Sequence, residues 1–194
     1  MAVTELVIGG SGSGKSAYAE QAVLAAGCGS MYYLATMRVL DAEMEKKVAR
    51  HKEMRAGRGW HTIEQPVDIG QAADVIAGAY KAPGSAKAPG WTCGGSSAVL
   101  LECLSNLVAN EMFRDGQIVP ENMVVQNIVS GIRRLMACTD CLVIVSNSVF
   151  SDGITYDEGT EAYIRALGRI NQETAGMADR VTEVVAGIPV RMKY

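Results

Sequence analysis

A phosphate-binding loop stands close to the start of the chain. Residues 9–16 read GGSGSGKS and fit the pattern G-x-x-x-x-G-K-[ST] at every fixed position, after an apolar run and before a helical one. Glycines let the backbone curve closely around a ligand and turn its N–H groups toward phosphate oxygens. A lysine at this place adds positive charge at the β- and γ-phosphates, and the next hydroxyl is placed to bind Mg²⁺. We therefore predict a nucleoside triphosphate site made by Gly9, Gly10, Ser11, Gly12, Ser13, Gly14, Lys15 and Ser16.

The alternative is a glycine-rich turn that binds nothing, and the Lys15-Ser16 pair at the required place argues against it. An acid should help to hold the metal at the end of a second strand, and Glu102 ends the apolar run AVLLE. Aspartate is commoner at that place, and an acidic residue is also favoured at the start of any helix. We predict that Ser16 and Glu102 form the Mg²⁺ site.

A histidine in a charged segment has two interpretations. If a helix runs from Asp41 to about Met54, His51 lies on the same stripe as Met44 and Val48. That pattern by itself favours a packing histidine. A neutral imidazole can also attack phosphorus and carry a nucleotidyl group covalently, so a nucleophile is the other interpretation. Positive charge for phosphate would then come from neighbours in the sequence: Arg50, Lys52 and Arg55.

Continuous apolar runs alternate with helical patterns along the chain. This alternation predicts an α/β fold, a mostly parallel sheet with helices on both faces. We expect strands at Glu5–Gly10, Met31–Met37, Trp60–Gln65, Ala98–Cys103 and Leu142–Asn147, and a terminal pair within Val181–Lys193 that turns at Gly187–Pro189.

Ligands of such sheets bind beyond the carboxyl ends of the strands, where Gly9, Thr36, Glu102 and Asn147 should lie. Between Lys81 and Ser97 the chain is rich in Gly, Pro, Ser and Ala, which predicts a long surface loop. We expect helices at Gly14–Ala26, Asp41–Met54, Val67–Tyr80, Leu104–Arg114, Glu121–Ala137 and Asp157–Ala178.

Composition limits the class of protein. The 194 residues suit a single domain over 1–194, and a net charge of -3 with scattered basic residues does not suggest a nucleic-acid partner. No stretch approaches the roughly 20 apolar residues of a membrane span, and no leader is recognisable, so we expect a cytoplasmic protein. The five cysteines are irregularly spaced, and the C-x-x-C at Cys138 and Cys141 is interpreted as two free thiols at a helix end.

Several segments together resemble one family. Besides GGSGSGKSAYAE, the chain carries YYLAT, LDAEMEKKVARHKEMR, WHTIE, VLLECLSNLVANEMF and IRALGRINQETAGMADRVTEVVAGIPVRMK. The phosphate loop is common to many enzymes, and the His-Lys helix together with the later motifs is much more specific. Over nearly its whole length the chain resembles the bifunctional adenosylcobinamide kinase / adenosylcobinamide-phosphate guanylyltransferase family of cobalamin biosynthesis.

The resemblance implies two reactions. Adenosylcobinamide would be phosphorylated with ATP or GTP, and GMP from GTP would then be transferred to that phosphate through a guanylylated histidine, which is His51 by motif position. It also implies a P-loop NTPase fold of the RecA-like kind and a small homo-oligomer, a trimer. Besides the phosphate loop, the nucleotide-binding positions that it implies are Leu34, Ala35, Thr36, Lys52, Glu53, Met54, Arg55, Glu64 and Glu102.

One departure from the family keeps two alternatives open. The family usually has N-E-V after the LVIVSN strand, and this chain has Asn147, Ser148 and Val149. The lost carboxylate would lie near the active site and bears on the kinase step or on contacts to the corrin. The alternatives are another P-loop small-molecule kinase that uses ATP, and a nucleotide-binding relative that has lost one or both activities.

Overall fold

The computed structural model describes residues 3–38, 57–81, 96–114, 116–148 and 156–194. Its centre is a seven-stranded sheet in the order β3-β2-β4-β7-β1-β8-β9. Neighbouring strands are parallel except for β8 and β9, which form an antiparallel hairpin. The strands are β1 Val3–Ile8, β2 Ser30–Ala35, β3 Trp60–Glu64, β4 Ser97–Glu102, β7 Cys141–Val145, β8 Arg180–Val185 and β9 Ile188–Lys193.

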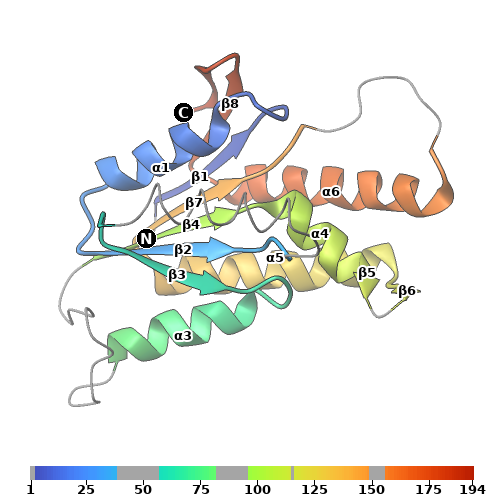
Figure 1. Ribbon diagram of the computed structural model, residues 1–194, viewed down its shortest axis with the longest axis horizontal. Helices are drawn as coiled ribbons and strands as arrows, with labels where there is room; N and C mark the ends of the chain where they lie inside the picture. The colour runs from blue at the N-terminus through green and yellow to red at the C-terminus, as the bar shows by residue number, and fades with distance from the viewer. Residues whose placement is uncertain (1–2, 39–56, 82–95, 115, 149–155) are drawn as a thin grey trace.

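Helices cover both faces of this sheet (Figure 1). Helix α1 packs on one face through Ala19 and Val23, against side chains of β1, β4, β7 and β8. The other helices contribute to a larger core on the opposite face. The prediction of a mostly parallel α/β fold is confirmed, while the helix expected at Asp41–Met54 lies outside the described residues. The helices are α1 Lys15–Ala25, α3 Gly70–Lys81, α4 Leu104–Met112, α5 Glu121–Cys138 and α6 Glu158–Met177.

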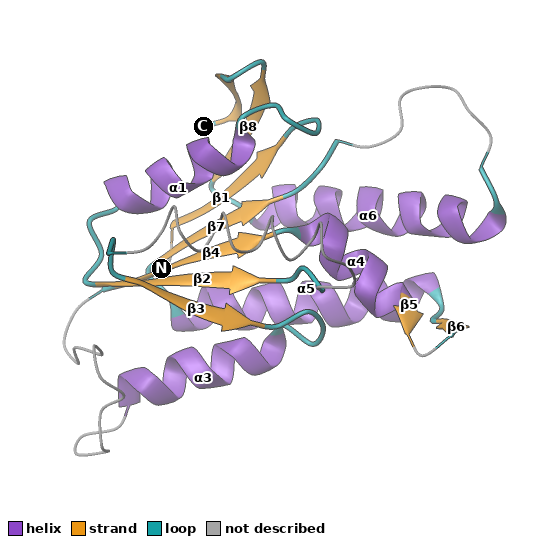
Figure 2. Cartoon of the chain, in the orientation of Figure 1, coloured by secondary structure: helices purple, strands orange, loops and turns teal. Residues whose placement is uncertain are grey.

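The parallel strands all end at one edge of the sheet, as the arrowheads in Figure 2 show. The apolar sequences of the inner strands are buried on both faces, since Leu100 and Leu101 of β4 face opposite cores and are both fully buried. Backbone polar groups in these strands are satisfied by the neighbouring strands. The polar side chains that follow the strands are therefore held at one edge of a sheet whose inner strands are buried on both faces.

Most predicted bounds differ from the observed ones by one to three residues: β1, for example, is Val3–Ile8 rather than Glu5–Gly10, and α3 begins at Gly70 rather than at Val67. Two of the differences change the local structure. The helix expected at Leu104–Arg114 ends at Met112, and the next two residues form a short strand, β5 Phe113–Arg114, paired with β6 Gln117–Ile118. The terminal turn was expected at Gly187–Pro189, but it is the pair Ala186-Gly187, with φ of 49° and 82°. A two-residue hairpin turn of type I′ needs positive φ at both central residues, which Ala186 and Gly187 provide. Pro189 lies inside β9 instead, because an edge strand tolerates a proline.

The C-x-x-C motif spans a helix end and a strand start, as expected. Cys138 is the last residue of α5, Cys141 is the first of β7, and both are free thiols. Their side chains pack on opposite faces of the sheet, Cys138 with the larger core and Cys141 with the α1 side. Within the described part of the chain, no helix is long and apolar enough to span a lipid bilayer.

Candidate nucleotide site

The backbone of the loop between β1 and α1 demands glycine at three positions. A Cβ on Gly9 would lie 2.6 Å from both Ser13 Oγ and the carbonyl oxygen of Val184. Gly12 and Gly14 have φ of 71° and 91°, which side-chain-bearing residues adopt only at a cost. The glycines of the motif therefore follow from the path of this loop.

The tip of the β8–β9 hairpin rests on the loop. The N–H of Gly187 donates a hydrogen bond of 2.8 Å to the carbonyl oxygen of Ser13. A Cβ on Gly14 would lie 3.3 Å from the Cα of Gly187, so the two backbones are nearly in contact. The far end of the chain thus helps to hold the shape of the loop, a contribution that the loop motif does not predict.

Lys15 is the buried cation of the site, with 9% of its surface exposed. Its Nζ donates a 2.9 Å hydrogen bond to the carbonyl oxygen of Gly10 across the loop. Burial lowers the pKa of Lys15 below its ordinary value, and the nearby Cys103 and Glu102 oppose that shift. A phosphate at the loop would supply a stronger partner than the carbonyl, so the lysine is placed for an anionic ligand.

Ser16 and Glu102 are brought together, as predicted. The Ser16 hydroxyl donates a short hydrogen bond to Glu102 Oε1. The other carboxylate oxygen, Oε2, accepts a 3.2 Å hydrogen bond from the Tyr33 hydroxyl of β2. Tyr33 is buried and was not among the predicted site residues. A hydroxyl and a carboxylate oxygen side by side are the hard ligands that Mg²⁺ prefers, so this pair fits the metal that phosphate transfer needs.

Ser13 supplies a further sign that the loop is suited to an anionic ligand. Its Oγ is buried in the loop and has no hydrogen-bond partner among the described residues. Buried hydroxyls in folded proteins nearly always have a partner, so such an atom calls for an explanation. A phosphate oxygen bound in the loop would provide one.

The residue that follows β2 is hydrogen-bonded to the residue that follows β4. The Thr36 hydroxyl donates to the carbonyl oxygen of Cys103 and accepts from its N–H, both at 2.8 Å. Thr36 is fully buried, and the Leu34 side chain is fully buried in the core on the α5 side of the sheet. Of the predicted group at Leu34, Ala35 and Thr36, the leucine can therefore reach a ligand only through its backbone.

Glu64 lies away from the phosphate loop. It is the last residue of β3, the edge strand, where it is opposite Ala35 in the parallel register. Four strand spacings separate β3 from β1, which is roughly 19 Å. A ligand that touches both the loop and this exposed carboxylate must extend across the ends of the strands.

A second polar cluster lies beyond β4 and β7. Asn147 donates through Nδ2 to Ser105 Oγ at 2.7 Å, and the same hydroxyl is 3.0 Å from Cys103 Sγ. The exposed Ser148 donates through its backbone N–H to the carbonyl oxygen of Gly9 at 3.3 Å, so the departure from the family pattern lies directly beside the phosphate loop. Ser105 was missed because a serine in the first turn of a helix is common. Its place two residues after Cys103, the residue that follows β4, was the available signal.

The predicted nucleophile segment cannot be placed relative to this site. The residues concerned lie outside the described part of the chain: His51, Lys52, Glu53, Met54 and Arg55.

Comparison with known proteins finds similarity over almost the entire chain. The family described as cobinamide kinase / cobinamide phosphate guanyltransferase matches residues 5–83 and 87–192. The bifunctional adenosylcobalamin biosynthesis protein CobU of Salmonella typhimurium is 33% identical, with 97% of this chain and 98% of that protein covered. The protein of the same description in Escherichia coli is 30% identical, with 97% and 98% covered.

A third relative is the bifunctional adenosylcobalamin biosynthesis protein CobP of Pseudomonas aeruginosa. It is 27% identical, with 97% of this chain and 96% of that protein covered. Among solved structures, the flagellar accessory protein FlaH of Methanocaldococcus jannaschii is similar at a TM-score of 0.48 and 12% identity, with 99% of this chain and 78% of that one covered.

Proposed function

Because this chain belongs to the cobinamide kinase / cobinamide phosphate guanyltransferase family, we propose that it phosphorylates adenosylcobinamide with ATP or GTP and then transfers GMP from GTP to the product. The observation that carries the kinase half is the Ser16–Glu102 hydrogen bond beside the buried Lys15. This hydrogen bond places two oxygen ligands suited to Mg²⁺ beside the phosphate-binding loop and its lysine, at one edge of the sheet.

In the kinase step the loop N–H groups and Lys15 hold the β- and γ-phosphates. The hydroxyl oxygen of the aminopropanol arm forms a bond to the γ-phosphorus, the bond to the bridging oxygen breaks, and the nucleoside diphosphate leaves. The hydroxyl proton passes to solvent. Ser16 and Glu102 would hold Mg²⁺, which offsets the phosphate charge when bound. Tyr33 orients Glu102 by its hydrogen bond to Oε2.

In the transfer step a nitrogen of His51 attacks the α-phosphorus of GTP and pyrophosphate leaves. The GMP is then joined to the histidine by a P–N bond. An oxygen of the adenosylcobinamide phosphate attacks the same phosphorus, the P–N bond breaks, and adenosylcobinamide-GDP leaves with the histidine free again. In this proposal the residues that follow the nucleophile also line the site: Lys52, Glu53, Met54 and Arg55. The nucleotide is contacted further by Leu34, Ala35, Thr36 and Glu64.

We further propose that a single domain over residues 1–194 performs both steps in the cytoplasm as a homotrimer. Glu64 lies roughly 19 Å from the strand that leads into the phosphate loop, and in this proposal a neighbouring subunit completes the site there.

The experiment that tests the function is intact-protein mass spectrometry after incubation with GTP and Mg²⁺. Wild type should gain one GMP, and acid should release it because a P–N bond to histidine is acid-labile. His51→Ala should gain nothing but should still phosphorylate adenosylcobinamide, whereas Lys15→Ala should lose both steps.

The two other functions give different results. A P-loop kinase of another kind would form no adduct and would leave adenosylcobinamide unchanged. A relative that has lost catalysis would bind GTP with neither adduct nor transfer, and the exposed Ser148 beside Gly9 is the feature that would favour it.

A further inference from the structure

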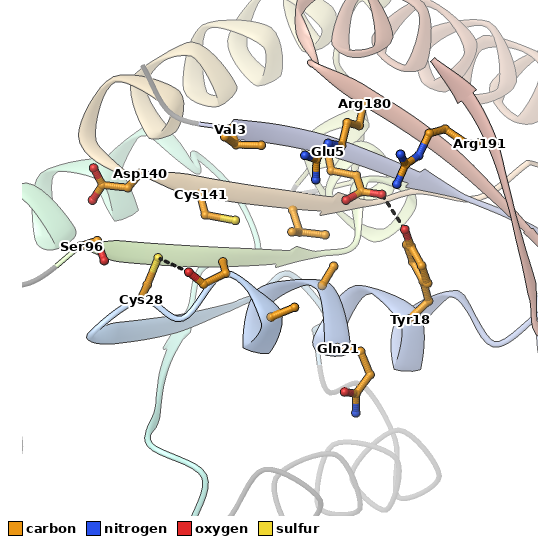
Figure 3. A pocket seen from close by; sticks show the side chains of 14 residues that line it. Val3, Glu5, Tyr18, Gln21, Cys28, Ser96, Asp140, Cys141, Arg180 and Arg191 are labelled. Atoms are coloured by element: carbon orange, nitrogen blue, oxygen red, sulfur yellow. Dashed lines mark hydrogen bonds between the residues drawn. The ribbon is translucent and has the colours of Figure 1, made fainter. Parts of the chain in front are cut away.

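A cavity lies at the opposite end of the sheet from the phosphate loop. It has a volume of about 640 Å³ and lies between α1 and the first residues of β1, β7 and β8 (Figure 3). That volume is typical of small-molecule sites. Along β1, Glu5 in the cavity and Gly9 in the loop are four residues apart, roughly 13 Å. The cavity is therefore separate from the proposed nucleotide site.

A buried carboxylate faces this cavity. Glu5 is 6% exposed, which is rare for an acid in the middle of a central strand. Its Oε1 accepts hydrogen bonds from the Tyr18 hydroxyl at 2.9 Å and the Thr182 hydroxyl at 2.7 Å. Among the residues that the structure describes, Oε2 accepts no hydrogen bond and has no ion pair. This oxygen is available to a donor inside the cavity.

Two arginines at the same end carry the opposite charge. Arg180 is opposite Glu5 in the β1–β8 register, and Arg191 is opposite Thr182 in the β8–β9 register, so the three side chains share one face. In Figure 3 both guanidinium groups lie near Glu5 at one end of the cavity. Within the described ranges, neither arginine has an ion pair, and Arg191 only lies over the Tyr194 ring at 5.8 Å. Two unpaired guanidinium groups side by side are suited to an anion.

The remainder of the cavity is small and apolar. Ala22, Ala25, Ala26 and Val143 line it, and Cys28 and Cys141 lie toward the end away from the arginines. Small side chains leave room for a flat group that can pack on them without a hydrogen bond.

From this arrangement we propose that the cavity binds a mononucleotide, with its phosphate on Arg180 and Arg191, an N–H or O–H donor on Glu5 Oε2 and its base over the alanines of α1. A mononucleotide combines the three features that the lining requires: an anion, a donor and a flat body. Because the cavity is remote from the phosphate loop, this binding does not depend on the proposed transfer reaction.

The test measures binding of GMP, AMP and inorganic phosphate by calorimetry to Lys15→Ala, in which the phosphate loop is impaired. GMP or AMP should still bind at one site. Adding Arg180→Gln or Arg191→Gln should weaken that binding about tenfold or more, as expected for a lost charge-assisted contact. Both arginines are exposed, so these variants should fold. The matched control is Arg133→Gln, an exposed arginine on α5, which should change nothing.

A second readout uses the cysteines. Bound mononucleotide should slow alkylation of Cys28 several-fold and leave Cys138, on the other face of the sheet, unaffected. Loss of all nucleotide binding in Lys15→Ala, with no protection of Cys28, would show a single site at the loop and overturn the proposal. Binding that ignores both arginine variants, or inorganic phosphate binding as tightly as GMP, would also overturn it. These binding and alkylation measurements do not depend on GMP transfer to His51, so they can be read even if the protein gains no GMP in the mass-spectrometry experiment.

Discussion

Replacing Tyr33 with phenylalanine tests whether the tyrosine positions Glu102. The change removes the hydroxyl of a buried tyrosine, and with it the 3.2 Å hydrogen bond to Glu102 Oε2. Hydrogen bonds to charged groups contribute about 1.5–3 kcal/mol. This one is long, so we take the low end, which corresponds to about a tenfold weaker hold on the metal.

The assay is the rate of adenosylcobinamide phosphorylation as a function of Mg²⁺ concentration. We expect the half-maximal Mg²⁺ concentration to rise about tenfold in Tyr33→Phe, with little change of rate at saturating Mg²⁺. Tyr32→Phe is the matched control, because the neighbouring tyrosine packs on the opposite face of the sheet. In a Glu102→Gln background, Tyr33→Phe should have no further effect on the Mg²⁺ requirement.

Two results would refute this reasoning. One is a lower rate in Tyr33→Phe at every Mg²⁺ concentration with an unchanged half-maximal concentration, which would indicate a general loss of structure. The other is an equal shift in Tyr32→Phe, which would mean that the loss of any hydroxyl on β2 has this effect.

Three further predictions concern the loop. Gly14→Ala should abolish nucleotide binding in a filter assay, because position 14 has φ of 91° and a Cβ there would lie 3.3 Å from the Cα of Gly187. The control is Gly10→Ala, which should bind normally because no atom lies within 4 Å of the added Cβ. Burial lowers the pKa of Lys15, and a bound phosphate favours its charged form, so the affinity for nucleotide should fall as the pH rises toward that pKa. Calorimetry at alkaline pH in two buffers of different ionisation enthalpy should then detect proton uptake on binding, and equal heats in both buffers would contradict this. Ser148→Glu should raise the phosphorylation rate several-fold, and an unchanged rate would show that the reaction does not need a carboxylate beside the loop.

The loop and its acidic partner could be predicted because their information is local. A glycine pattern followed by Lys15-Ser16 describes one turn of backbone, and Glu102 is recognisable because it ends an apolar run. Parallel strands bring their carboxyl ends to one edge, so Ser16 and Glu102 were expected at the same edge. Their direct contact also depends on β4 lying only two strands from β1, whereas Glu64 on β3 lies four strands away.

Tyr33 could not be predicted in the same way. Tyr32 and Tyr33 are adjacent in one strand and point to opposite faces, and the sequence does not say which face carries α1. The answer depends on β2 lying next to β4 in register, with Ala35 opposite Glu102. That pairing joins segments far apart in the chain and has no local signature.

The cavity was missed for another reason. The run ELVIGG was interpreted as a buried strand, which is correct, and its first residue was treated as a boundary. Glu5 is in fact inside β1, between Arg180 on one side and Val143 on the other. An acid within a central strand was the available signal, because charged residues are almost never fully buried without a partner.

The contact between Gly187 and Ser13 has a consequence for synthesis of the protein. A ribosome makes the phosphate loop long before the hairpin that rests on it. Strand β1 also needs the later strands β7 and β8 on its two sides. A nascent chain that has exposed only its amino-terminal half therefore has the loop sequence without the loop shape. We expect the growing polypeptide to acquire affinity for nucleotide only after the β8–β9 hairpin has left the exit tunnel, so nucleotide in the cell can stabilise only chains that already carry this hairpin.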